Sequence, residues 1–323
     1  MARILTGVQA TGRPHLGNIL GAILPAIRAA KDSKDESFLF IADMHSLTLI
    51  KDAEELRENT YAVAKTWLAM GLDTEKTVFY RQSDVPQTCE LTWYLDCFFP
   101  YQRLQLAHAF KDKADRLSDV NAGLFNYPIL MAADILLYDA DLVPVGKDQA
   151  QHLEFTRDVA ERFNHRMGET FVLPQGLTQE NAMIIPGTDG AKMSKSRNNY
   201  IDIFSSEKQL KKTIGSIVTD STPLEEPKDP DTCNVFKLYS LIASAEQTAE
   251  LAEKYRGGGF GYGHAKKALL ELILDTYAKE REAYNYYTEH IDIVEDLLMQ
   301  GAKKAAEVAE IRLQDVRRKL GFR

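Results

Sequence analysis

The stretch RILTGVQATGRPHLGN, residues 3–18, decides the fold of this chain. An apolar run from Arg3 to Val8 predicts a buried strand, and Pro14 and Gly17 then mark a turn. From Ile19 to Ala30 the residues have an amphipathic helical pattern. Strand, glycine-containing turn and helix in this order place backbone N–H groups and the positive end of a helix where a phosphate chain can bind.

A second segment, KMSKS at residues 192–196, lies about 175 residues beyond the first. Its lysines and serines predict a mobile cationic loop that neutralises the charge developing on leaving phosphates. Together the two segments predict nucleotide chemistry on an α/β sheet.

Further strand-like runs at residues 38–43, 77–81 and 141–145 alternate with helical patterns, which predicts a parallel sheet covered on both faces. Residues 91–141 read as continuously helical, and from about residue 198 onward only helical patterns remain. We therefore predict an α/β fold, a Rossmann-type parallel sheet with a smaller all-helical C-terminal domain. Ligands of such sheets bind at the carboxyl ends of the strands.

Composition restricts the class of protein. The 323 residues suffice for two domains, and no apolar run approaches the roughly 18–20 residues of a membrane span. The N-terminus has no signal-peptide pattern and the three cysteines form no CxxC pair, so we expect a cytoplasmic protein with reduced thiols.

The net charge of −8 argues against indiscriminate nucleic-acid binding. Two segments, 191–213 and 301–323, nevertheless each carry a local charge of +4. Each is equally well explained as a contact for RNA or as a solvated helix face.

His15 lies in the first turn, at the start of the predicted helix. An isolated histidine there is usually a surface residue, but Gly7, Gly12, Gly17 and Gly21 crowd the same region and indicate a close approach of the backbone to a ligand. A protonated or hydrogen-bond-donating imidazole at this point could stabilise charge on a phosphoryl group. The spacing fits neither a dinucleotide GxGxxG motif nor a Walker A loop.

GVQATGRPHLGN resembles the HIGH motif of the class I aminoacyl-tRNA synthetases, and KMSKS matches the second motif of that class without a departure. The spans FLFIADMHSLT (38–48), NYPILMAADILLYDADLVPVGKDQAQHLEFTRDVAERF (126–163) and SIVTDST (216–222) extend the resemblance to the bacterial tryptophanyl-tRNA synthetases over nearly the whole chain. The combination of both motifs is far more specific than either one alone.

Asp134 interrupts an otherwise apolar helical pattern. A buried carboxylate without a partner is costly, so Asp134 either lies at a solvent edge, pairs with a lysine, or accepts a hydrogen bond from a ligand such as an indole N–H. The resemblance implies the last role. Met131 stands where the related tyrosyl enzymes carry Gln in a QxxD pattern, and an apolar neighbour suits a flat bicyclic ring with a single donor.

The resemblance also assigns the remaining site residues. The catalytic residues are His15, Asn18, Lys192 and Lys195. The tryptophan site consists of Leu5, His45, Tyr127, Met131, Asp134, Val143 and Gln149. The ATP site consists of Gln9, Thr11, Gly17, Asn18, Gly146, Lys147, Asp148, Met183, Lys192, Met193, Ser194, Lys195 and Ser196. Without the resemblance, Met131 and Val143 would be read as core residues and Gln149 as a polar residue at a helix start.

Three positions depart from the family pattern. Leu5 replaces a usual aromatic residue, Lys147 replaces an acidic one, and Arg197 follows KMSKS where Asp is frequent. The cysteine cluster that holds an iron–sulfur centre in some relatives is absent from the sequence, and we expect no metal site on the protein. The glycine-rich segment 257–263 follows no strand and predicts a helix end rather than a phosphate loop.

The resemblance implies four parts. These are a Rossmann-type catalytic domain (1–190) with a helical insertion at about 91–140, the KMSKS loop (191–200), a helical anticodon-binding domain (201–295) and a C-terminal helix (296–323) that packs back on the catalytic domain. It also implies a homodimer that activates L-tryptophan with ATP and then charges tRNA(Trp). Mg²⁺ would be bound mainly through the ATP phosphates.

In this mechanism the substrate carboxylate attacks the α-phosphorus in line, without a protein nucleophile. His15 and Asn18 stabilise the α-phosphate, and Lys192 and Lys195 neutralise pyrophosphate. Two alternatives remain open at this point, a tyrosyl-tRNA synthetase and a non-catalytic paralogue that binds tryptophan or RNA. The intact KMSKS sequence argues against the second.

Overall fold

The computed structural model describes residues 2–32, 34–107, 120–146, 149–178 and 184–322. Its centre is a five-stranded sheet in the order β3-β2-β1-β4-β5, with every neighbouring pair parallel. The strands are β1 (Arg3–Gln9), β2 (Glu36–Ala42), β3 (Thr77–Arg81), β4 (Leu142–Val145) and β5 (Gln175–Thr178). The strand order reverses between β1 and β4, which is where ligands of doubly wound sheets bind. The predicted Rossmann-type sheet is confirmed.

Short and long helices connect the strands. They are α1 (Leu16–Asn18), the π-helical turn η1 (Ile19–Ile23), α2 (Leu24–Asp32), α3 (Asp43–Ser46), α4 (Ala53–Ala69), η2 (Gln82–Asp84), α5 (Gln87–Asp96), α6 (Tyr101–Leu104), α8 (Ala122–Leu136), α9 (Ala150–Met167) and η4 (Lys195–Arg197). The D-x-x-E pattern of Asp52 and Glu55 predicts a helix start, and Asp52 caps α4 by accepting a hydrogen bond from the Glu55 backbone N–H at 2.8 Å.

Two details differ from the sequence expectation. The region 91–141 is not continuously helical, because α5 ends at Asp96 and Pro100 begins a separate short helix. Strand β5 was not expected, since QGLT contains a glycine and only one strongly β-forming residue. A Cβ at Gly176 would lie 2.9 Å from the end of the Leu153 side chain, so the glycine lets β5 pack close to α9.

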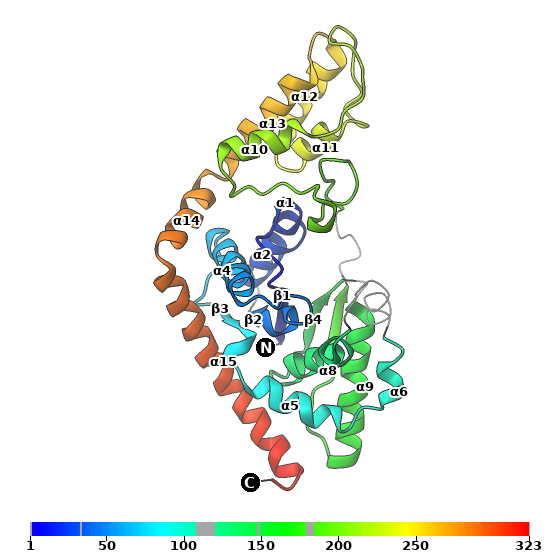
Figure 1. Cartoon of the computed structure of the whole chain (residues 1–323), viewed down its shortest axis with the longest axis vertical. Coiled ribbons are helices and arrows are strands. Elements are labelled where there is room, and N and C mark those ends of the chain that lie inside the picture. The colour runs from blue at the N-terminus through cyan, green and yellow to red at the C-terminus, as the bar shows by residue number, and fades with distance from the viewer. Residues whose placement is uncertain (1, 33, 108–119, 147–148, 179–183, 323) are drawn as a thin grey trace.

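Beyond the KMSKS segment the described chain is helical. Its elements are α10 (Glu207–Gly215), α11 (Asn234–Ser240), α12 (Ala245–Gly257), α13 (Tyr262–Thr276), α14 (Ala278–Glu289) and α15 (Ile291–Lys319). Figure 1 shows α10–α13 as a lobe at one end of the molecule, with α14 and α15 running from it along the side of the sheet. Gly258, with φ +73°, ends α12, so the glycine-rich segment is a helix terminus as predicted.

Apolar side chains cover both faces of the sheet. Leu39 and Ile41 of β2 belong to one buried cluster, whereas Phe38 and Phe40 belong to another on the opposite face. Among the described residues, none of the helices is long and apolar enough to cross a membrane.

Helix α15 lies along the edge strand β3 and contributes to both clusters. Val294 and Leu298 pack into the first cluster, and Ala302, Ala305 and Ala309 pack into the second. At the crossing point Gly301 meets the strand directly, since a Cβ there would lie 1.8 Å from the Phe79 carbonyl oxygen. The sequence places Ala309, Leu313, Val316 and Leu320 on one apolar stripe, which predicts a partner surface. The first three of these side chains are completely buried, and Leu320 packs partly buried against the second cluster.

We predict that Gly301→Ala separates α15 from β3 and lowers the free energy of unfolding by about 2–4 kcal/mol, because the added methyl group has no space. Thermal and urea unfolding would measure the loss. Gly263→Ala is the matched control, because its Cβ would meet no atom within 4 Å. An unfolding midpoint equal to that of this control would contradict the close approach.

Candidate active site

The two sequence motifs meet above the carboxyl end of β1. The Leu16 backbone N–H donates to the Ile201 carbonyl oxygen at 2.8 Å, which joins the first turn to the segment after KMSKS. Between them lies a hollow of about 540 Å³. It is lined by Thr11, His15, Gly17, Asn18, Ile185, Lys192, Met193, Ser194, Lys195, Ser196 and Arg197. The structure thus brings together nine residues that the sequence assigned to catalysis or ATP.

His15 is the N-cap of α1. Its Nδ1 accepts from the Asn18 backbone N–H at 3.3 Å, and Asn18 Oδ1 accepts from the His15 backbone N–H at 3.1 Å. This reciprocal pair assigns the remaining ring proton to Nε2. Burial, reinforced by the charge of Lys195, lowers the pKa of His15 to about 4. The ring is therefore a neutral donor at pH 7, and the protonated form considered from sequence is disfavoured.

Lys195 reaches from the KMSKS loop to the first motif. Its Nζ donates to the Thr11 carbonyl oxygen at 3.0 Å and lies over Gly12, where a Cβ would be 3.2 Å away. Burial lowers the pKa of Lys195 to about 8, and the Asp202 carboxylate opposes this shift. The lysine is cationic at pH 7 and half-buried beside His15.

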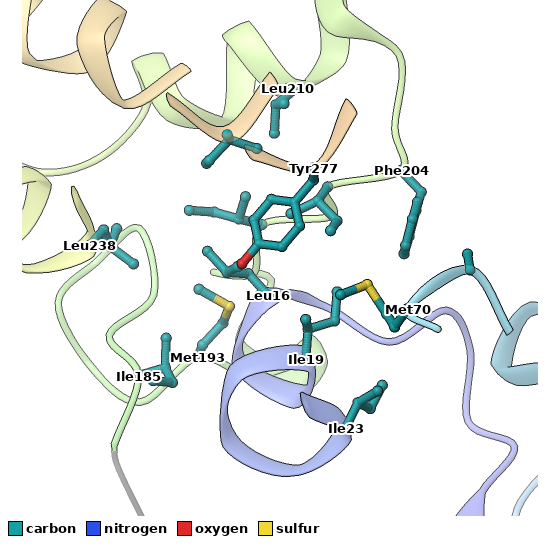
Figure 2. Packing of buried hydrophobic residues seen from close by; sticks show 14 of the residues in the cluster. Leu16, Ile19, Ile23, Met70, Ile185, Met193, Phe204, Leu210, Leu238 and Tyr277 are labelled. Atoms are coloured by element: carbon teal, nitrogen blue, oxygen red, sulfur yellow. The ribbon is translucent and has the colours of Figure 1, made fainter. Parts of the chain in front are cut away.

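Met193 fixes the loop by packing under it. Its side chain is buried in the cluster that also contains Leu16 and Tyr277, and Figure 2 shows these three residues close together. The Met193 sulfur accepts from the Gly17 backbone N–H at 3.2 Å. A Cβ on Gly17 would crowd the His15 ring at 3.0 Å and Met193 Cβ at 3.3 Å. The atoms that crowd Gly17 thus belong to the protein, and the close approach of a ligand expected from the sequence stays a prediction.

Asn199 holds the KMSKS loop in shape and was missed in the sequence. Its buried side chain accepts from the Ser194 N–H at 2.7 Å and donates to the Lys192 carbonyl oxygen at 3.1 Å and to Asp189 at 2.6 Å. A Cβ on Gly187 would lie 2.4 Å from this amide. The Asn198-Asn199 pair, one residue beyond KMSKS, was the available signal, since Asn198 adopts the left-handed conformation with φ +52°.

A second group of polar residues lies at the ends of β2 and β3. Asp134 is buried, and its carboxylate accepts from His45 Nε2 at 2.8 Å and from Gln82 Nε2 at 2.8 and 2.9 Å. Burial raises the pKa of Asp134, and both hydrogen bonds oppose this by stabilising the ionised form. Neither the solvent edge nor a lysine partner considered from sequence is observed. A carboxylate has about four acceptor positions, and these contacts with His45 and Gln82 use three of them. One acceptor position of Asp134 therefore remains for a ligand donor.

Gln82 was also missed, although it follows β3 at the same edge of the sheet as the other polar residues. Its Oε1 accepts from the His45 backbone N–H at 3.3 Å, which orients the amide toward Asp134. Asp43, at the end of β2, accepts from Ser83 N at 3.0 Å and so holds this turn. Applying the strand-end rule to β3 would have found Gln82.

The rings of Tyr127 and His45 lie 4.4 Å apart, and the Tyr127 hydroxyl accepts from Gln9 Nε2 at 3.0 Å. This contact links the residue assigned to ATP with one assigned to tryptophan. The buried Nδ1 of His45 has no hydrogen-bond partner among the described residues. With Nε2 donating to Asp134, Nδ1 is an acceptor open to a ligand.

The other predicted residues are placed as follows. Leu5 and Val143 are buried in the core cluster that Met131 packs against, so contact with a ligand is not evident from their positions. Gln149 is the N-cap of α9 and its N–H donates to the Gly146 carbonyl oxygen at 3.0 Å. Lys147, Asp148 and Met183 lie outside the described residues.

No group of three His, Cys, Asp or Glu side chains suited to a metal ion occurs in the described part of the chain. The three cysteines are free thiols, two exposed and one buried. The hollow between the motifs is instead lined by cations, hydroxyls and backbone N–H groups, which is a donor set for an anion.

Comparison with known proteins agrees with this geometry. Residues 1–278 match the family described as tRNA synthetases class I (W and Y), and the chain belongs to this family of aminoacyl-tRNA synthetases. Two relatives, tryptophan–tRNA ligases of Rhodopirellula baltica and Fusobacterium nucleatum, are each 48% identical. The first comparison covers 99% of this chain and 100% of the relative, and the second covers 100% and 98%.

Among solved structures, tryptophanyl-tRNA synthetase from Campylobacter jejuni complexed with ADP and tryptophan is 46% identical, with a TM-score of 0.96 over 99% of this chain and 100% of that chain. A tyrosyl-tRNA synthetase from Archaeoglobus fulgidus has 20% identity and a TM-score of 0.64, covering 88% and 90% of the two chains, which is a likeness of fold alone. The resemblance found in the sequence is confirmed.

The pH dependence of ATP–pyrophosphate exchange tests the electrostatics of the site. We predict that kcat/KM for ATP falls as the pH rises through about 8, because Lys195 then loses its charge. No acidic limb from His15 is expected near pH 6.5, because its pKa lies near 4. Lys195→Arg keeps the charge at high pH and should move the alkaline limb upward. An unchanged limb in Lys195→Arg would contradict the assignment.

Proposed function

We propose that this aminoacyl-tRNA synthetase is a tryptophan–tRNA ligase that joins L-tryptophan to ATP and transfers the activated amino acid to tRNA(Trp). One observation carries the proposal. An anion-binding hollow formed by both motifs lies at the same edge of the sheet as a buried acceptor group, Asp134 with His45 and Gln82. The names of the relatives support the same substrate.

In the proposed reaction the tryptophan carboxylate attacks the α-phosphorus of ATP and pyrophosphate leaves. His15 Nε2–H and Asn18 donate to oxygens of the α-phosphate, and Lys192 and Lys195 neutralise the leaving group. A neutral His15 suits this role, because it can donate a hydrogen bond without releasing a proton.

The hollow fits ATP accompanied by Mg²⁺. None of its described lining residues is Asp or Glu, whereas lysines and hydroxyls are plentiful. This set would hold the phosphates, and the metal would be bound through phosphate oxygens and water. Mg²⁺ would supply further neutralisation of phosphate charge.

The amino-acid pocket is proposed around Asp134. An indole N–H would occupy the free acceptor position of the carboxylate, while Tyr127 and Gln149 contact the ammonium and carboxylate groups of tryptophan. Gln82 joins this pocket as a positioning residue for Asp134.

We predict that exchange is supported by tryptophan alone among the twenty amino acids. Asp134→Asn should raise the KM for tryptophan by about 10- to 100-fold, because a charged acceptor is lost while the volume is kept. Asp139→Asn, a carboxylate just beyond α8 that pairs with Arg312, is the matched control. Exchange with tyrosine instead would favour the tyrosyl alternative, and no exchange in folded protein would favour a binding-only paralogue.

We propose residues 1–190 as the catalytic domain, including a helical insertion at about 91–140. The KMSKS loop spans 191–200, 201–295 form the anticodon-binding domain, and 296–323 form the helix that returns to the sheet. Four basic residues in the second half of α15, Arg312, Arg317, Arg318 and Lys319, form ion pairs, which favours a structural role for them. Lys303 and Lys304 of α15 are exposed, as are Lys208, Lys211 and Lys212 of α10, and no ion pair of these five lysines occurs in the described chain. The tRNA contact is proposed on α10, because its three lysines lie on one short helix of the proposed anticodon-binding domain. The cytoplasmic location stays a prediction.

We propose that the active form is a homodimer. Large apolar side chains are exposed on neighbouring segments at Leu47, Leu49, Trp93 and Tyr101, with Trp93 67% exposed. The segments adjoin, because Cys89 Sγ of α5 lies 3.6 Å from Met44 Sδ of α3. Exposed apolar patches of this kind often mark interfaces.

Light scattering after size-exclusion chromatography tests the dimer. We predict a dimer mass for the wild type and a monomer for Trp93→Glu, because a charge cannot be buried there without a partner. Val218→Glu is the control, since Val218 is 60% exposed in the segment that follows α10, in the helical lobe and away from α3 and α5. A monomeric wild type or a dimeric Trp93→Glu variant would contradict this interface.

A further inference from the structure

Arg13 lies two residues before His15 and is not among the residues assigned to the reaction. Its guanidinium donates to Asp202 Oδ2 at 2.8 Å, which connects the first motif to the segment that follows KMSKS. The pair is partly exposed, with 38% and 20% of the two side chains accessible, so it contributes little to stability. The charges of Arg13 and Asp202 also act on neighbouring charged residues of the site, above all on Lys195.

The Lys195 ammonium lies beside the Arg13–Asp202 pair, because it donates to the Thr11 carbonyl oxygen at 3.0 Å and would be 3.2 Å from a Cβ on Gly12, the residue before Arg13. In this position the Asp202 carboxylate raises the pKa of the Lys195 ammonium, against the lowering caused by burial. Asp202 is held in this region because Ile201, the residue before it, accepts the backbone hydrogen bond from Leu16. Asp202 Oδ1 accepts from the Phe204 backbone N–H at 2.9 Å, so the carboxylate has a fixed orientation.

Arg13 is also held in place, by aromatic and cationic neighbours. Its guanidinium lies 5.1 Å from the centre of the Tyr284 ring of α14, and Lys65 of α4 lies 5.0 Å from the same ring. Phe204 stacks on Tyr284 at 4.4 Å. Arg13 therefore has a defined position that keeps it on Asp202.

Two cations thus compete for one carboxylate. Lys195 must be free to bind the phosphates of ATP, whereas Asp202 is an anion fixed beside it. We propose that Arg13 is a positioning residue that occupies the Asp202 carboxylate, so that the Lys195 ammonium stays directed at the phosphates. This inference rests on the proposed function, because it assigns Arg13 to the same reaction.

The test is a charge-rescue series measured by tryptophan-dependent ATP–pyrophosphate exchange. We expect Arg13→Ala to lower kcat/KM for ATP by about tenfold, the effect of losing one charge-assisted contact between Lys195 and phosphate. The assays are run at about pH 6.5, well below the Lys195 pKa of about 8, so that loss of the Asp202 charge does not by itself deprotonate Lys195. Under this condition Asp202→Asn alone should be close to wild type, and the double variant should recover most of the loss. Arg13→Lys should retain most of the activity. The affinity for tryptophan, measured by calorimetry, should stay unchanged in all four variants.

A merely structural ion pair gives a different pattern. In that case Asp202→Asn and the double variant are as impaired as Arg13→Ala, and the proposal is overturned. It is also overturned if Arg13→Ala equals wild type. The exposed pair Lys254–Glu250 of α12, at 2.7 Å, provides the control series Lys254→Ala, Glu250→Gln and their double variant. Failure of the wild type to exchange would concern the proposed function rather than Arg13.

Discussion

The hydrogen bond from the Leu16 backbone N–H to the Ile201 carbonyl oxygen is the contact on which the active site depends. It joins two segments far apart in the sequence. Because it uses backbone atoms, it places the whole KMSKS loop over the first turn rather than a single side chain. The buried Met193 side chain packs against Gly17 and accepts a hydrogen bond from its backbone N–H. Lys195 donates to the Thr11 carbonyl oxygen, and its charge helps to keep His15 neutral. This one backbone contact therefore brings together the charged and polar groups that line the hollow.

The two polar parts of the site, the hollow between the motifs and the group around Asp134, are stabilised in different ways. In the hollow between the motifs the cationic side chains remain partly exposed to solvent. Burial there is sufficient to lower the pKa values of His15 and Lys195. Asp134 is fully enclosed and needs donors, which His45 and Gln82 supply. A substrate that brings a further donor is tolerated there, whereas one that leaves the carboxylate short of donors is not.

Local signals in the sequence were sufficient for β1, β2, β3 and β4, for the two motifs and for the helical lobe. Strand β5 was missed because QGLT has few β-forming residues, and its pairing with β4 and its packing against Leu153 arise only in the fold. Gln82 was missed although it follows a strand, because its partner Asp134 lies 52 residues away in the sequence and is brought close by the fold. Asn199 acts locally, on residues 189–194, and was missed because the asparagine pair beyond KMSKS was not used as a signal. The basic C-terminal segment stayed ambiguous in the sequence, since its acidic partners, such as Glu90 and Asp139, belong to distant elements.

The approach of Gly301 to the Phe79 backbone has a consequence for how the chain is made. Strand β3 is at the edge of the sheet, and α15 lies along this edge and adds side chains to the clusters on both faces. During synthesis on a ribosome β3 emerges long before α15, so the edge is uncovered while the helical lobe is being translated. Exposed strand edges pair readily with other chains. The nascent protein is therefore most vulnerable to aggregation in this interval, which ends when α15 docks.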